Sequence, residues 1–173
     1  MSSSENLIKI IPQLGREVIG AEIGVRSGDN LAYILESCPN IIKMYAIDPY
    51  CPYQDGDTYI DQDFQNKVKE EAIALLTEKN LIDKVEFIQM LSDDAASLIE
   101  DKSLDFIFID GNHDYEYTLS DLKNYYNKIR NLGVISGHDL TYTWPGVEQA
   151  LKEFLPEKGL SFTDVQYLGG TAW

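Results

Sequence analysis

Polar residues and glycines follow five short apolar segments of this chain, at spacings that could assemble one chemical site. Carboxylates and imidazoles can bind a metal ion, move a proton or hold hydroxyl groups, and glycines let the backbone approach a ligand closely. The candidate site residues are Glu22, Gly24, Gly28, Asp48, Ser92, Asp93, Asp110, His113, His138 and Asp139. Their types predict a ligand site with acid–base or metal chemistry.

Gly24 and Gly28 follow the first apolar segment and precede a helical pattern. A helix that starts at such a loop offers free N–H groups to a ligand. The spacing G-x-x-x-G lacks the first-to-second glycine step of the dinucleotide fingerprint G-x-G-x-x-G, which argues against NAD. The same two glycines could also shape a tight turn that holds no ligand.

Asp48 follows this glycine loop at a spacing close to the ~20 residues at which an acidic residue can accept hydrogen bonds from ribose hydroxyls. An alternative is an Asp-Pro turn, since Pro49 comes next. Together, the loop and Asp48 favour a ribonucleoside pocket.

The elements that must position these residues alternate between two hydrophobic periods. A short N-terminal helix around Leu7 to Ile11 comes first, and no internal repeat follows. Period-two or continuous apolar runs predict strands over 18–23, 41–47, 85–88, 104–109, from 134–135 onward, and 161–168. Helical periods predict helices over 30–37, 64–79, 94–99, 117–130 (ended by Gly133) and 147–154.

Five strand-then-helix units in a row predict an α/β fold with a single doubly wound, mostly parallel sheet in a three-layer αβα sandwich. Ligands of such sheets bind beyond the carboxyl ends of the strands, where all the candidate residues fall. We expect one domain over 1–173, with an N-terminal helix in 1–16, a core over 17–156 and a short C-terminal strand region over 157–173.

Composition agrees with one packed domain and excludes several classes of function. The chain has 173 residues, of which 44% are hydrophobic and 25% charged. Its net charge of −15 disfavours nucleic acids and anionic membranes as partners. Two cysteines without CxxC spacing indicate no disulfide scaffold or structural zinc site. With no signal peptide and no apolar run near ~18 residues, we expect a cytoplasmic protein.

Four sequence motifs in this order resemble those of class I S-adenosylmethionine-dependent methyltransferases. They are EIGVRSG, AIDPY, FIDGNHDYEYTLSDL, and LGVISGHD followed by Pro145-Gly146-Val147. The resemblance runs from about Glu17 to Phe154. It is strongest to a small subgroup related to macrocin-type sugar O-methyltransferases and cephalosporin-hydroxylase-like proteins, and it implies a Rossmann-like methyltransferase fold.

The resemblance also implies roles for the cofactor residues. Glu22, Gly24 and Gly28 would line the methionine and ribose end of S-adenosylmethionine, and Asp48 would hold the ribose hydroxyls. Ser92 and Asp93 would lie at the adenine.

In the sugar methyltransferases that the chain resembles, a divalent metal such as magnesium binds the acceptor hydroxyls near the fourth and fifth strand ends. The matching positions are Asp110, His138 and Asp139, with His113 close by. The macrocin-type pattern has two adjacent acidic residues after the fifth strand, whereas this chain has His138 first. His138 could therefore be a general base instead of a ligand, and His113 could be a loop imidazole hydrogen-bonded to Asp110 or Asp114.

The expected function is O-methylation of a small hydroxylated molecule, such as a sugar or a natural-product scaffold. The competing hypothesis is a non-catalytic methyltransferase-like nucleoside-binding module. Class I enzymes usually end with an antiparallel hairpin that supports the acceptor site, whereas the C-terminal strand region expected here is short. Acceptor recognition would fall to the loop 49–63 with Tyr50, Tyr53 and Tyr59, to Trp144, or to a second subunit in a homo-oligomer.

Overall fold

A five-stranded parallel sheet forms the centre of the computed structural model, which describes residues 4–5, 7–55, 58–166 and 171–173. The strand order is β5-β2-β1-β6-β7, and every neighbouring pair is parallel. The strands are β1 (Val18–Ile23), β2 (Ile41–Ile47), β5 (Val85–Ile88), β6 (Leu104–Ile109) and β7 (Ile129–Gly137). The predicted doubly wound α/β sheet is confirmed.

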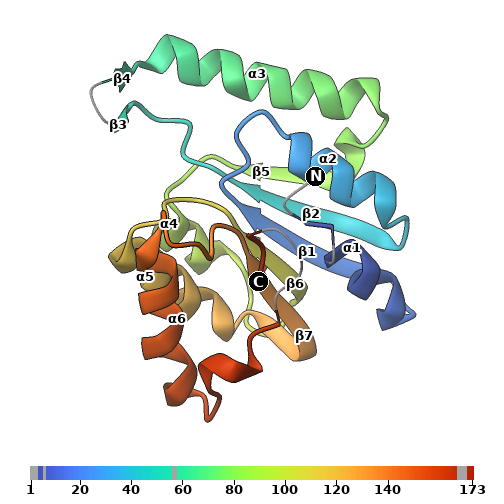
Figure 1. Ribbon diagram of the computed structural model, residues 1–173. Helices are drawn as coiled ribbons and strands as arrows, with labels where there is room; N and C mark the ends of the chain where they lie inside the picture. The colour runs from blue at the N-terminus through green and yellow to red at the C-terminus, as the bar shows by residue number, and fades with distance from the viewer. Residues whose placement is uncertain (1–3, 6, 56–57, 167–170) are drawn as a thin grey trace.

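Helices cover both faces of this sheet and give the three predicted layers (Figure 1). One face packs against α1 (Leu7–Ile10), the 3-10 turn Ile11–Leu14, α2 (Asp29–Ser37) and α3 (Gln62–Glu78). The other face packs against α4 (Ser92–Ala95) with the 3-10 turn Ala96–Leu98, α5 (Tyr115–Tyr126) and α6 (Pro145–Glu157).

Strand β6 lies in the middle of the core, and all six of its residues are buried. Phe106 and Phe108 belong to the apolar cluster on the α2 side, and Ile107 and Ile109 to the cluster on the α5 and α6 side. Alternate side chains of a strand point to opposite faces, so a strand covered on both faces is largely apolar, and Asp105 is the charged exception in β6.

The chain reverses its direction of sheet growth between β1 and β6. It first builds outward from β1 to β2 and β5, and then returns to the other side of β1 to add β6 and β7. Ligands of open α/β sheets bind in the crevice outside the carboxyl ends at such a switch point. The loops after β1 and β6 lie at this switch point.

The helix predicted over 117–130 is wrong at its end, since α5 stops at Tyr126 and β7 begins at Ile129. Arg130 Nη1 bonds both carboxylate oxygens of the buried Asp105 on β6, at 3.0 and 2.9 Å. This ion pair holds the chain beside β6. Gly133 therefore lies within the strand, where a Cβ atom would come within 2.7 Å of Asp105 O.

The strand predicted over 161–168 is also wrong in its described part. Residues Phe162–Asp164 form a 3-10 helix, because Ser161 and Asp164 cap it reciprocally. Residues 167 and 168 lie outside the described residues. The helix predicted over 147–154 is longer than expected, and Pro156 lies in its last turn.

The loop 49–63 contains a small hairpin that was not predicted. Strands β3 (Tyr53–Asp55) and β4 (Thr58–Ile60) pair antiparallel and lie beyond the carboxyl end of β2 (Figure 1). Across the described residues, no helix combines the length and apolarity that crossing a bilayer requires.

Candidate active site

Glu22, near the end of β1, is 1% exposed and carries an unsatisfied oxygen. Its Oε1 accepts a hydrogen bond from Asn30 Nδ2 of α2 at 3.0 Å, and Ser4 Oγ donates to Asn30 Oδ1 at 2.7 Å. Its Oε2 is buried and meets no hydrogen-bond partner among the described residues. Burial raises the pKa of Glu22 to about 8; the Asn30 hydrogen bond opposes this, and the Asp110 and Asp48 charges add to it.

The loop after β1 depends on glycine for two reasons. Gly24 and Gly28 have φ values of 84° and 80°, in the left-handed region. A Cβ atom on Gly24 would also lie 2.1 Å from Asp110 O, after β6. The glycine loop and the β6 loop are thus in direct contact. Gly28 precedes α2, whose first turn is capped by no described side chain.

Asp48 ties this loop to the end of β2. Its Oδ2 accepts from Arg26 N and its Oδ1 from Tyr50 N, both at 2.9 Å. Tyr50 is buried, and its hydroxyl donates to Arg26 O at 2.9 Å. The turn geometry weighed as an alternative is therefore present. Each Asp48 oxygen still has a second lone pair for a ligand hydroxyl.

Ser92 and Asp93 begin α4 and contact α5. Asp93 Oδ1 accepts from Ser120 Oγ at 2.6 Å and from Asn124 Nδ2 at 2.8 Å. The Tyr125 hydroxyl donates to Ser92 O at 2.8 Å. The structure thus directs the Asp93 carboxylate toward α5, while the other four predicted cofactor residues lie at the ends of β1 and β2 and in the glycine loop.

The four predicted catalytic residues form one hydrogen-bonded cluster. Asp110 and His113 follow β6, while His138 and Asp139 follow β7, and the pairing of Ile109 with Gly137 aligns the two strand ends. His138 Nδ1 lies 3.4 Å from Asp110 Oδ1 and 3.2 Å from Asp139 Oδ2. His113 Nε2 lies 3.0 Å from the same Asp139 oxygen. All four side chains are partly buried.

The environment of His138 favours its charged form. The hydrogen bond with Asp110 raises the pKa of His138 above its usual value, although burial opposes the shift, and the Asp110 and Asp139 charges add to it. Both ring nitrogens are engaged, because Nε2 lies 2.6 Å from Thr171 Oγ1. His138 therefore bridges the two carboxylates.

Within the part of the chain that the structure describes, the side chains that could share a metal ion are Asp110, His113 and Asp139, whose ligand atoms lie within 4.8 Å of one another. The sequence-based set had His138 in place of His113. His113 bonds Asp139, and not Asp110 or Asp114 as the loop-imidazole alternative expected.

Further residues contact the site, and two of them, Trp144 and Gly146, lie at positions that the sequence already indicated. Trp144 packs on His113 with ring centroids 5.0 Å apart. Gly146 lies against the same loop, since a Cβ atom there would come within 2.7 Å of His113 O. The sequence did not indicate Asn30 or Thr171. Asn30 lies on the next element after its partner Glu22, whereas Thr171 is distant in sequence from its partner His138.

The tyrosines of the loop 49–63 differ in exposure. Tyr50 is buried, whereas Tyr53 and Tyr59 are 48% and 65% exposed. Tyr53 pairs with Ile60 and Tyr59 with Gln54, so the two exposed rings lie on opposite faces of the hairpin. Tyr50 is a support for Asp48 and not a wall of the crevice.

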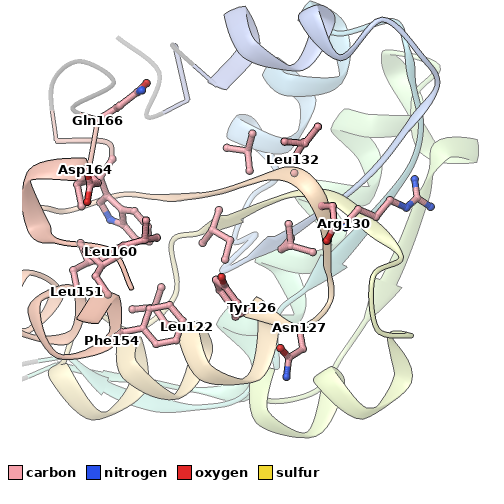
Figure 2. A pocket seen from close by; sticks show the side chains of 18 of the residues that line it. Leu122, Tyr126, Asn127, Arg130, Leu132, Leu151, Phe154, Leu160, Asp164 and Gln166 are labelled. Carbon is pink, nitrogen blue, oxygen red and sulfur yellow. The ribbon is translucent and has the colours of Figure 1, made fainter. Parts of the chain in front are cut away.

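A separate cavity of about 740 Å³ lies beside β7, between α5, α6 and the segment 160–166. Leu122, Tyr126, Leu151 and Phe154 line it (Figure 2). Arg130 also lies at its edge, but its guanidinium bonds Asp105. The cavity contains none of the predicted site residues.

A sheet with this order and this switch-point site defines a Rossmann-like α/β enzyme fold. A family model described as a methyltransferase domain matches residues 21–140. The chain belongs to this methyltransferase family and is an S-adenosylmethionine-dependent methyltransferase. A search of curated proteins found no match.

Solved structures of three other proteins share the fold. Precorrin 8w decarboxylase from Methanobacterium thermoautotrophicum has a TM-score of 0.63 and 16% identity, over 88% of this chain and 69% of that chain. An S-adenosylmethionine-dependent O-methyltransferase from Thermotoga maritima has a TM-score of 0.60 and 15% identity, over 85% of this chain and 47% of that chain. CalS11, a TDP-rhamnose 3′-O-methyltransferase of calicheamicin biosynthesis, has a TM-score of 0.58 and 14% identity, over 86% of this chain and 68% of that chain.

Proposed function

We propose that this methyltransferase transfers the methyl group to a hydroxyl of a small molecule, such as a sugar or a natural-product scaffold. The observation that carries the proposal is the contact between Gly24 and the Asp110 backbone, which joins the glycine loop to the cluster of ionisable side chains. A methyl donor on the loop and a hydroxyl on the cluster would be neighbours. The shared fold with a sugar O-methyltransferase supports this substrate class.

The residues at the β1 and β2 ends fit S-adenosylmethionine, which supplies an electrophilic methyl group on a sulfonium. The buried Glu22 Oε2 has no hydrogen-bond partner among the described residues, and with Glu22 ionised the protonated amino group of the cofactor would donate to it. Glu22, Gly24 and Gly28 would hold its methionine and ribose end, and Asp48 the ribose hydroxyls. Ser92 and Asp93 would contact the adenine. A net charge of −15 suits a cationic donor.

Methyl transfer to oxygen requires alignment of the acceptor and removal of its proton. We assign the base to His113. Its Nε2 bonds Asp139, so Nε2 carries the proton and Nδ1 keeps its lone pair. Asp139 orients His113, and His138 holds Asp139 and Asp110 together. This assignment replaces His138 as base, because both of its nitrogens are engaged.

A divalent cation could serve the same acceptor hydroxyl. Asp110, His113 and Asp139 fit such an ion in donor type and spacing. Two carboxylates suit magnesium, and the imidazole also suits manganese or zinc. A bound ion would polarise the hydroxyl and make a free imidazole base unnecessary.

A screen of methyl transfer to sugars, phenols and hydroxylated natural products tests this function. We expect product with at least one hydroxyl compound and none in a matched Asp139→Asn protein. Removal of metal by a chelator separates the mechanism with His113 as base from the mechanism with a divalent cation. Only the cation mechanism predicts that the rate of methyl transfer falls when the metal is removed. Absence of transfer to every hydroxyl compound, with transfer to an amine or thiol, would contradict the proposal.

A further inference from the structure

The segment 171–173, called here the tail strand, pairs with the end of β7 beside the catalytic cluster. Trp173 N donates to Gly137 O at 3.0 Å, and Gly137 N donates to Trp173 O at 2.9 Å. Leu140 N donates to Thr171 O at 3.0 Å. These reciprocal bonds are those of an antiparallel pair. The tail strand therefore flanks His138 and Asp139 through the backbone on either side of them.

Side chains of the tail strand hold His138 at two further points. Thr171 Oγ1 lies 2.6 Å from His138 Nε2, and Trp173 Nε1 donates to His138 O at 3.1 Å. The Trp173 ring is 6% exposed and fills the space above Gly137, where a Cβ atom would come within 2.5 Å of it. His138 is thus fixed by its backbone and by one ring nitrogen.

This anchoring decides which nitrogen faces the carboxylates. With Nε2 on the Thr171 hydroxyl, Nδ1 points between Asp110 and Asp139. Asp139 in turn bonds His113, so the chain of contacts runs from Thr171 through His138 and Asp139 to His113. If the Thr171 hydroxyl is removed, the His138 ring loses the contact that fixes its rotation. Asp110 and Asp139 then no longer share a His138 Nδ1 donor whose position is fixed.

We infer that Thr171 is a positioning residue for methyl transfer, which acts through His138 on the Asp110 and Asp139 carboxylates. The inference rests on the proposed function and adds a residue that touches neither the glycine loop nor His113 in the described contacts. Removing the hydroxyl should lower kcat by roughly 10- to 100-fold, with little change in cofactor affinity.

The chain contains only two histidines, so the ring nitrogens can be observed directly. ¹⁵N-labelled protein gives two imidazole patterns by NMR, and a His113→Gln protein assigns them. At one fixed pH, we expect Thr171→Val to shift the His138 Nε2 signal. Thr171→Ser, which keeps a hydroxyl, should retain the wild-type signal and most of the activity. Thr77→Val is the matched control, because its hydroxyl bonds Ile73 O within the exposed surface of α3.

The outcomes are distinct. An unchanged His138 pattern in Thr171→Val, or a Thr171→Ser protein as impaired as Thr171→Val, would overturn the inference. If Thr171→Val and Thr171→Ala both fail to fold while Thr171→Ser folds, the residue is structural and the inference is also wrong. The NMR measurement needs no ligand. Failure of the wild type to methylate hydroxyl compounds would instead contradict the proposed function, and the NMR result on the contact between Thr171 and His138 would still be interpretable.

Discussion

At the scale of single residues, Glu22 stands out because it is buried with one carboxyl oxygen that has no hydrogen-bond partner among the described residues. Once ionised, this carboxylate with its unpaired buried oxygen destabilises the fold, and a ligand donor at that oxygen would relieve the penalty. The raised pKa has a direct consequence for stability. Between the ordinary carboxyl pKa and about 8, the unfolded chain has lost the Glu22 proton while the folded chain keeps it, so stability falls as pH rises.

We therefore expect Glu22→Gln to stabilise the ligand-free protein at pH 8 more than at pH 5, by on the order of 2 kcal/mol. Urea denaturation at the two pH values measures the difference. Glu17→Gln removes the same charge from an exposed position just before β1 and serves as control. Equal effects of Glu22→Gln at both pH values would show that the folded protein does not hold Glu22 neutral.

A second prediction at this scale concerns His113. As the assigned base, it should contribute roughly 100-fold or more to turnover. His113→Gln should lower kcat by that factor and leave the affinity for S-adenosylhomocysteine within about twofold, because the cofactor residues lie elsewhere. Initial rates and calorimetry measure the two effects. A large loss of cofactor affinity with unchanged kcat would contradict the assignment.

Sequence reasoning named the strand-end residues because parallel strands bring their carboxyl ends together, and Asp110, His113, His138 and Asp139 do meet. It could not distinguish His113 from His138 as the partner of the carboxylates in the possible metal set, since ring orientation depends on tertiary contacts. Thr171 illustrates the limit. Its contact with His138 joins two segments whose pairing no local pattern encodes.

At the scale of elements, close contacts between loops explain the glycines. Gly24→Ala and Gly159→Ala form a matched pair, because φ is 84° and 72° respectively, but only the first Cβ atom meets another atom within 4 Å. We expect Gly159→Ala to cost about 1 kcal/mol of unfolding free energy and Gly24→Ala clearly more. Gly24→Ala should also abolish cofactor binding. Equal costs with retained binding would show that the two loops do not touch.

The early end of α5 is likewise an effect between elements. Asp105 is 0% exposed and is held by Arg16, Arg130 and the Ile19 amide. Local periodicity predicts helix through residue 130, but this buried carboxylate draws Arg130 into β7. An isolated pattern does not contain that information, and the same holds for the capped turn at 162–164.

Arg130→Met should therefore destabilise the protein by on the order of 2 kcal/mol, because a buried carboxylate loses one of its two cations. Lys79→Met is the comparison. It removes an exposed ion pair with Glu36 and should cost under about 1 kcal/mol. Denaturant midpoints of the two variants measure both effects, and a smaller loss for Arg130→Met than for Lys79→Met would contradict this role of Asp105.

At the scale of the whole molecule, the order of the sheet places the site. The doubly wound sheet was predictable because the apolar periods are strong and each strand is followed by a helix. The switch between β1 and β6 then brings the glycine loop next to Asp110 and its neighbours at one edge of the sheet. The contacts of the loop 49–63 and of the tail strand are not encoded in such periods, because their packing is set only in the folded chain.

The most direct test of the central claim is a calorimetric titration of the purified protein with S-adenosylhomocysteine, with NADH as the control ligand. The proposed site predicts one-site binding of S-adenosylhomocysteine in the micromolar range, weakened at least tenfold in Asp48→Ala, and no binding of NADH. A cooperatively folded protein that binds neither ligand, or binds NADH instead, would contradict the assignment of the glycine loop and Asp48 to a methyl donor.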